Sequence, residues 1–139
     1  MGNTKSFNKI SFEDVQYVIE RKSSLLINTL STNEQNCLIK STVTVQEEEK
    51  VMNELLSHNN SGKIIIVYGK NNNDETIYTK YNQLLSLGLS NVYLYVGGLF
   101  EWLLLQDTYG DDNFPTTSNE LDYLKFRPRS LFLNCIENR

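Results

Sequence analysis

The sequence contains few of the residues on which disulfide frameworks, metal sites and histidine catalysis depend. Its 139 residues include 2 cysteines, 2 prolines and 1 histidine. Cys37 and Cys135 stand far apart, which fits neither a disulfide framework nor a paired zinc motif, so we expect a reducing compartment. Any imidazole-based site would need His58, which follows an expected helix in a turn sequence and is interpreted as structural. We therefore expect no metal and no cofactor.

Long apolar runs and clusters of positive charge are also missing. No run approaches the roughly 18 to 20 residues that a membrane-spanning helix requires, and residues 1–30 lack the layout of a signal peptide. With 13 Lys and Arg against 17 Asp and Glu, the net charge is -4, and no Lys/Arg cluster is longer than a pair. A nucleic-acid partner is therefore not expected. These absences predict a cytoplasmic protein.

What is present is an alternation of short apolar runs with segments of helical periodicity. Strands are expected at 24–29, 37–39, 63–68 and 92–96, and helices at 11–22, at 47–57, from Ile77 up to Gly88 and at 102–105. This alternation predicts an α/β fold with a central parallel sheet of about five strands and helices on both faces. We expect a flexible tail at 1–10, one domain at 11–107 and an extension at 108–139 that packs back on it.

The candidate site follows the strongest expected strand, 63–68. Ligands of open parallel sheets bind at the carboxyl ends of the strands, beside the N-termini of the following helices. The candidate residues there are Gly69, Lys70, Asn71, Asn72, Asn73, Asp74 and Glu75. The residues expected beside this loop are Asn28 and Leu30, from the strand at 24–29, and Gly97 and Gly98, after the strand at 92–96.

Four segments, in this order, resemble the rhodanese (sulfurtransferase) family over residues 10–107. They are Ser24–Leu30, similar to its first core strand; Cys37–Thr42, at its Gly-His-Ile-Pro-Gly-Ala segment; Ile64–Gly69, similar to the strand before its active-site cysteine; and Gly88–Tyr93 with Gly97, Gly98 and Trp102, similar to its Gly-aromatic-x-x-Val segment followed by Gly-Gly and Trp. The resemblance implies the rhodanese fold. It also implies a reactive thiolate, held by backbone amides, that carries sulfur as a persulfide.

The chain departs from this family where the chemistry would take place. The position that matches the catalytic cysteine is Gly69, which supplies no nucleophile. Phosphatases of this fold would need that cysteine and an arginine about six residues later, and the loop holds no arginine. Asp74 and Glu75 are expected to cap the next helix with their carboxylates and to repel an anion. Asn28 and Leu30 replace a strand-end Asp and Arg of the family.

These departures predict a catalytically inactive rhodanese-like module that binds an unidentified protein partner. One alternative is a sulfur or phosphoryl transferase with a non-standard nucleophile, for which Cys37 is the candidate, although its apolar neighbours favour a buried, inert thiol. The other is a lipid-tethered scaffold whose partner binds residues 121–139. Met1–Ser6 fits the pattern for N-myristoylation of Gly2, and a single acyl chain gives only weak, reversible membrane association.

Overall fold

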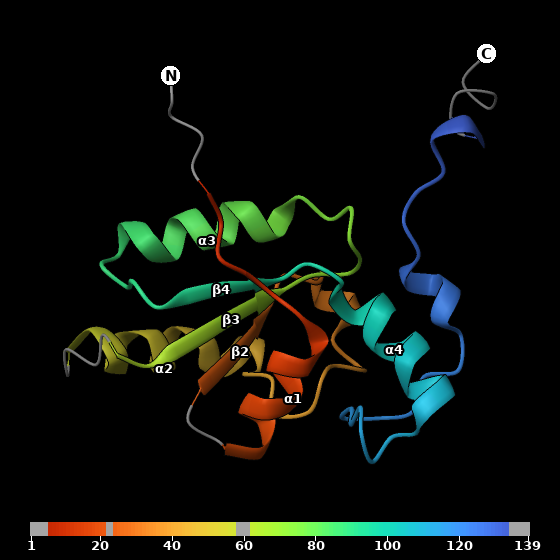
Figure 1. Ribbon diagram of the computed structural model, residues 1–139. Helices are drawn as coiled ribbons and strands as arrows, with labels where there is room; N and C mark the ends of the chain where they lie inside the picture. The colour runs from red at the N-terminus through yellow and green to blue at the C-terminus, as the bar shows by residue number, and fades with distance from the viewer. Residues whose placement is uncertain (1–5, 22–23, 58–61, 134–139) are drawn as a thin grey trace.

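The computed structural model describes residues 6–21, 24–57 and 62–133, which form an α/β domain around one parallel sheet (Figure 1). The sheet has four strands in the order β1-β4-β3-β2, and all three neighbouring pairs are parallel. The strands are β1 (Lys9–Ile10), β2 (Ser24–Asn28), β3 (Ile64–Tyr68) and β4 (Val92–Tyr95). The helices are α1 (Phe12–Arg21), α2 (Val45–Ser57), α3 (Thr76–Ser86) and α4 (Gly98–Tyr109), with short 3₁₀ helices η1 (Thr32–Glu34) and η2 (Tyr123–Phe126).

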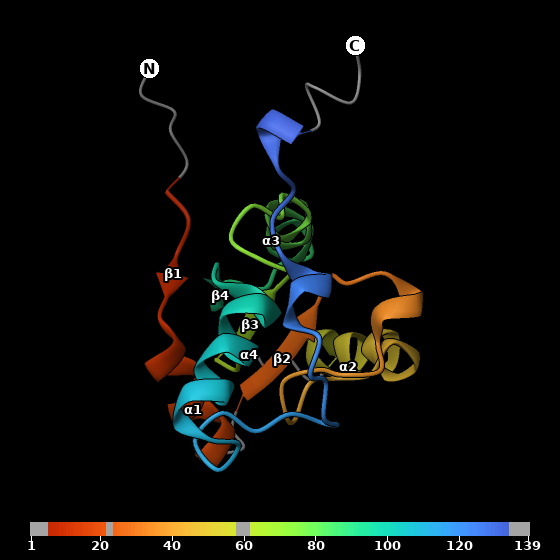
Figure 2. The same cartoon turned by 90° about the vertical axis from the view of Figure 1, so that its right-hand side faces the viewer.

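Helices cover both faces of the sheet, as the alternating pattern predicts (Figure 2). Successive side chains of a strand point to opposite faces, so neighbours in β3 enter different cores. Ile66 and Tyr68 pack with residues of α1 and α4, whereas Ile65 and Val67 pack with residues of α2 and α3. Because both faces are buried, β3 is an apolar run without polar alternation. This apolar run is the reason why residues 63–68 were the strongest expected strand.

The helix ends follow local signals in the sequence. The backbone N–H of Ser11 donates to the Asp14 carboxylate (3.0 Å), half of the capping arrangement expected at the start of α1. Helix α2 begins at Val45, two residues before the expected start, with Glu47 and Glu48 in its first turn. Gly88 has a φ of +100° just after α3, a conformation that favours glycine.

The sheet lacks one strand that the sequence predicts, at residues 37–39. Residues 37–39 do not join the sheet; Ile39 instead forms an isolated antiparallel bridge to Thr116 of the C-terminal extension. The buried Tyr68 hydroxyl accepts a hydrogen bond from the backbone N–H of Ile39 (3.2 Å) and pairs with the Thr42 hydroxyl (2.7 Å). These contacts fix the segment beside the end of β3. The described residues therefore form four strands, not about five.

The edge strand β1 lies within residues 1–10, which were expected to be a flexible tail. The backbone N–H of Leu94 donates to the carbonyl of Asn8 (2.7 Å), and the Phe7 ring lies edge-on to Tyr78 and Tyr81 at centroid distances of 4.7 and 5.2 Å. The expectation of a tail is therefore wrong for residues 6–10. A pairing of two residues depends on backbone hydrogen bonds and one aromatic side chain, which gives almost no periodic signal in the sequence.

The C-terminal extension contacts the domain through two buried phenylalanines, Phe114 and Phe126. The Phe114 ring lies edge-on to Trp102 at 5.0 Å, and the Trp102 indole N–H donates to the carbonyl of Pro115 (3.1 Å). Helix α4 runs to Tyr109, past the expected boundary at 107. Among the described residues beyond 120, the extension holds the short helix η2 and helical residues at 131–133. Among the described residues, no helix is long and apolar enough to cross a membrane.

Candidate functional site

A cleft of about 590 Å³ lies at the carboxyl ends of β2 and β3. Three separate parts of the chain line it: the turn after β2 (29–31 and Glu34), the loop and helix start after β3 (70, 71 and 73–76), and Arg127 and Arg129 of the extension. Figure 1 shows the loop from β3 to α3 on the right of the sheet, with the blue C-terminal segment rising beside α4. The candidate loop therefore lies at an open cleft.

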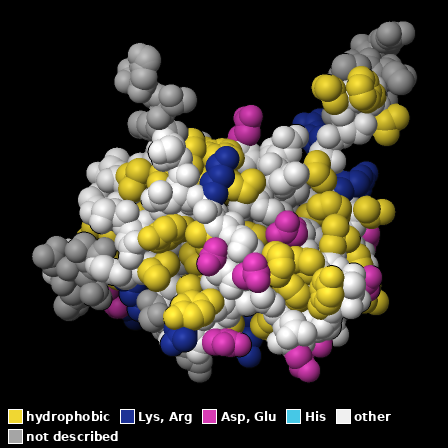
Figure 3. Space-filling view, viewed as in Figure 1, with side chains coloured by type: hydrophobic (Ala, Val, Ile, Leu, Met, Phe, Trp, Pro, Cys, Tyr) yellow, Lys and Arg dark blue, Asp and Glu magenta, His cyan; other side chains and the backbone are white. Residues whose placement is uncertain are grey.

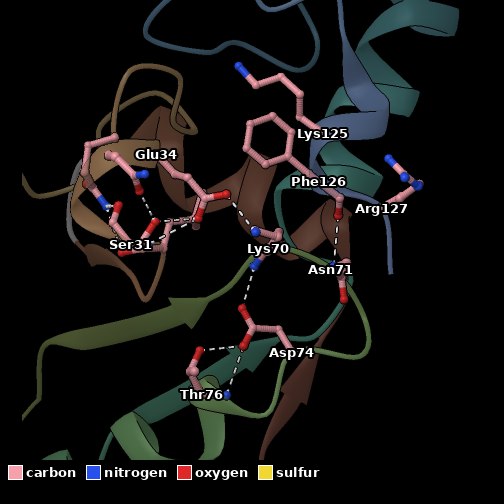
Figure 4. Close-up of polar contacts among 12 residues, drawn as sticks. Ser31, Glu34, Lys70, Asn71, Asp74, Thr76, Lys125, Phe126 and Arg127 are labelled. Atoms are coloured by element: carbon pink, nitrogen blue, oxygen red, sulfur yellow. Dashed lines mark hydrogen bonds and ion pairs between the residues drawn. The ribbon is translucent and has the colours of Figure 1, made fainter. Parts of the chain in front are cut away.

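The carboxylate of Asp74 fills the interior of the loop after β3 (Figure 4). Its Oδ2 accepts from the backbone N–H of Lys70 (2.9 Å), and its Oδ1 accepts from the N–H (3.0 Å) and hydroxyl (2.6 Å) of Thr76. A Cβ placed on Gly69 would overlap this carboxylate and come within 2.9 Å of the Ile77 methyl Cγ2. The space for a side chain at 69 and two of the loop's amide donors are therefore already taken.

Helix α4 holds the same loop from behind. The backbone N–H groups of Leu99 and Phe100 donate to the carbonyls of Gly69 (3.0 Å) and Lys70 (2.9 Å). Gly98 has a φ of +70°, and a Cβ there would stand 2.7 Å from the carbonyl oxygen of Gly69. Only glycine permits this approach. Gly98 therefore supports the loop and does not line the cleft.

Gly97 lies beside a second buried contact, away from the cleft. A Cβ on Gly97 would lie 2.5 Å from Cδ of Glu101, whose carboxylate accepts the Tyr95 hydroxyl (2.6 Å). Burial, and then the Glu101 carboxylate, raise the pKa of Tyr95, so its hydroxyl stays protonated and donates. The pair Gly97–Gly98 thus allows close packing on two sides.

Asn71 links the loop to the C-terminal extension. It is buried, its side-chain Nδ2 donates to the carbonyl of Phe126 (2.9 Å), and its Oδ1 accepts from the N–H of Asn73 (2.9 Å). Its neighbour Asn72 is exposed and does not line the cleft. Of the three consecutive asparagines, only the first holds two parts of the site together.

Asn28 has a similar structural task in the turn after β2. Its Oδ1 accepts from the N–H of Leu30 (3.0 Å) and from the side-chain amide of Gln35 (2.8 Å). Asn28 is buried and does not line the cleft, whereas Leu30 does. Leu30, one of the expected neighbours of the loop, therefore lines the cleft directly. Asn28, the other, contributes to the cleft only by holding the turn after β2 in place.

Two of the charged residues that line the cleft, Lys70 and Glu34, pair with each other. Lys70 Nζ lies 2.7 Å from the Glu34 carboxylate. Although burial acts to raise the pKa of Glu34, hydrogen bonds from Lys70 and Ser31 outweigh it and hold this pKa below its usual value. Glu75 forms no side-chain hydrogen bond at the start of α3, so the expected capping comes from Asp74 alone.

Arg127 and Arg129 are site residues that the sequence analysis missed. Arg127 Nη1 donates to the carbonyl of Leu124 (2.7 Å), and neither arginine forms an ion pair with a described carboxylate. They come into the cleft because Phe126 is buried and held by Asn71. The sequence offered one signal, two arginines separated by a single proline, but nothing in it places them beside residues 69–75.

The profile of the rhodanese-like domain family matches residues 12–105. The chain belongs to this family. The resemblance inferred from the four sequence segments is thereby confirmed, and so is the fold that it implied. No curated protein matches the sequence.

Solved structures show the same fold at low sequence identity. The rhodanese-like domain of an Anabaena protein has a TM-score of 0.59 and 18% identity, with 90% of this chain and 87% of that chain covered. A Saccharomyces cerevisiae homologue of single-domain rhodanese and the Cdc25 phosphatase catalytic domain has a TM-score of 0.57 and 13% identity, with 84% of this chain and 90% of that chain covered. A single-domain sulfurtransferase of the same yeast has a TM-score of 0.52 and 19% identity, with 81% of this chain and 99% of that chain covered.

The alternative nucleophile of this rhodanese-like domain, Cys37, is buried and does not line the cleft. Its thiol contacts the carbonyl of Ser118 at 3.3 Å. Burial raises the pKa of Cys37, so the unreactive thiol form prevails at neutral pH. Gly2, His58 and Cys135 lie outside the described residues, and the described part holds no group of three side chains suited to a metal.

Proposed function

We propose that this rhodanese-like domain does not transfer sulfur and that it acts by binding another protein at the cleft. The observation that carries the proposal is the Asp74 carboxylate beside Gly69, hydrogen-bonded to the backbone N–H groups of Lys70 and Thr76. The loop thus carries its own anion at the position that matches the family's reactive thiolate.

Electrostatics also support the proposal that this domain does not transfer sulfur. A reactive cysteine needs nearby positive charge or free amide donors to lower its pKa. Here two of those donors already bind a carboxylate, which would also repel a second negative charge at contact distance. An anionic sulfur donor such as thiosulfate would meet the same repulsion. Replacing Gly69 alone would not restore the site.

The alternative proposals have less support. A transferase that uses Cys37 would need a thiol that reaches the cleft, but Cys37 is buried and its pKa is raised. One structural neighbour is a sulfurtransferase and another is a homologue of a phosphatase domain, but at this identity they show the fold alone. A lipid-tethered scaffold depends on acylation of Gly2, outside the described residues.

A thiosulfate–cyanide assay tests the proposal directly. We expect no turnover by the wild type, and the same result for Cys37→Ser. Turnover by the wild type would refute the proposal, and its loss in Cys37→Ser would identify the alternative nucleophile. Mass analysis of protein made in a eukaryotic host tests separately whether Gly2 is acylated.

A second experiment tests the role of Asp74 by comparing thiol reactivity. Gly69→Cys and Gly69→Cys/Asp74→Ser are made in a Cys37→Ser/Cys135→Ser background, and their alkylation by iodoacetamide is followed against pH. We expect the variant without the carboxylate to have a thiol pKa lower by about one unit, read from the pH at which the alkylation rate is half-maximal. Equal pKa values would show that Asp74 does not control the thiol at position 69.

A further inference from the structure

The residues that line the cleft carry three positive and three negative charges, and the two positive charges without an ion pair come from the C-terminal extension. Glu34 pairs with Lys70, and the Asp74 carboxylate is held inside the loop by three hydrogen bonds from neutral groups. Asp74 and Glu75 keep their negative charges on the side of α3, whereas the guanidinium groups of Arg127 and Arg129 lie on the side of the extension. In the space-filling view, Lys and Arg side chains lie on the right-hand side, beside the projecting C-terminal segment (Figure 3).

Both arginines belong to an extended segment that lines the cleft. Arg127 has torsion angles of φ −65° and ψ 154° and is followed by Pro128, so the chain does not continue as a helix. Arg127 and Arg129 both line the cleft. Phe126, buried and bonded to Asn71, anchors the segment just before them (Figure 4).

We propose that the cleft binds an extended acidic segment of a partner protein, whose carboxylates pair with Arg127 and Arg129. Guanidinium groups bind carboxylates through two parallel hydrogen bonds. This inference rests on the proposed function and names the chemistry of the partner.

The same geometry disfavours a small anion in the loop. The N–H groups of Lys70 and Thr76, which would bind such an ion, already donate to Asp74. The positive groups that remain stand at the rim of an open cleft, where a peptide passing along the 127–129 segment meets them. Glu75 repels an acidic peptide from the side of α3, so the peptide is expected to follow the arginines.

Fluorescence anisotropy with the full chain tests the inference. The probe is a labelled peptide of alternating Glu and Ser, and its control has Gln in place of Glu. We expect the wild type to bind the acidic peptide and not the control, with affinity falling as salt rises. Arg127→Gln/Arg129→Gln is expected to raise the Kd about tenfold, because two partly exposed ion pairs are lost.

Arg21→Gln is the control outside the cleft: it removes one positive charge, against two in the double variant, from α1, where Arg21 lies over the Tyr17 ring (4.2 Å). It is expected to change the Kd less than about twofold, whereas Glu75→Gln is expected to tighten binding by about twofold. Circular dichroism checks that each variant is folded; both cleft arginines are exposed, so their removal should leave the fold intact.

Several results would overturn the inference. They are equal binding by the double arginine variant, an equal loss in Arg21→Gln, binding of the Gln peptide, or displacement of the peptide by millimolar thiosulfate or phosphate, which would indicate a small-anion site. Failure here leaves the sulfur-transfer assay unaffected, and turnover in that assay would refute the proposed function whatever the peptide does. The two claims therefore fail separately.

Discussion

Two regions of the cleft use their polar groups in opposite ways. One is the interior of the loop after β3, and the other is the rim, which Arg127 and Arg129 of the C-terminal extension form. Inside the loop, the N–H groups of Lys70 and Thr76 bind Asp74, and the carbonyls of residues 69 and 70 bind the start of α4. At the rim, Arg127 and Arg129 form no ion pair with a described residue. The interior lies within the family match at 12–105, and the rim lies outside it. The family scaffold is thus held by internal contacts, while the two arginines without an ion pair lie in a segment outside the family match.

The largest effect is expected at Gly98, where the interior depends on close backbone contact. Gly98→Ala would place a Cβ 2.7 Å from the carbonyl oxygen of Gly69 at a φ of +70°. We expect a loss of more than about 2 kcal/mol in the free energy of unfolding, measured with urea. Gly62→Ala is the control, because φ there is not positive and no atom lies within 4 Å of the added Cβ. An equal loss in the two variants would show that the loop tolerates displacement.

A smaller effect is expected at Asn71, the residue that joins the two regions. Asn71→Ala leaves the carbonyl of Phe126 and the N–H of Asn73 without their partner, which should cost about 2 kcal/mol of unfolding free energy. Binding of the Glu/Ser peptide should weaken as well, since the segment that carries the arginines loses its anchor. Asn72→Ala, an exposed position, should alter neither quantity measurably. If Asn71→Ala destabilises the protein but binds normally, the regions are independent.

The smallest effect concerns the ion pair between Glu34 and Lys70. The pKa of Glu34 is lowered in the folded protein, so its contribution to stability is present at neutral pH and is lost as pH falls through that pKa. Glu34→Gln should therefore be less stable than the wild type by about 0.5 kcal/mol at pH 7, because the pair is partly exposed. Urea unfolding at about pH 7 and about pH 3 checks this. A difference that persists at the acidic pH would exclude the charge as its cause.

Much of the fold was predictable because burial on both faces leaves apolar runs, as in β3, and because four segments resemble the family. The two-residue strand β1 was missed, since pairing through Asn8 and the backbone leaves no periodic pattern. Residues 37–39 were expected to form a strand because they are apolar, but they pair with the extension at Thr116 instead. In both cases a tertiary contact, absent from local sequence, decided the structure.

The site was predictable only in part, for the same reason. The position of the loop and the carboxylate cap by Asp74 follow from local order along the chain. The roles of Asn71 and of the two arginines depend on the hydrogen bond between Asn71 and Phe126, which are distant in the sequence. No local sequence pattern predicts that contact.

The hydrogen bond from Asn71 to the carbonyl of Phe126 makes the loop a reporter for events outside it. The Asn71 side chain also accepts a hydrogen bond from the N–H of Asn73. A displacement of the extension would therefore also shift the loop that carries Asp74 and its two amide donors. Amide protons of Lys70 and Thr76 exchange with solvent only when these bonds open. Occupation of the arginines should therefore slow the exchange of these two amide protons for deuterium.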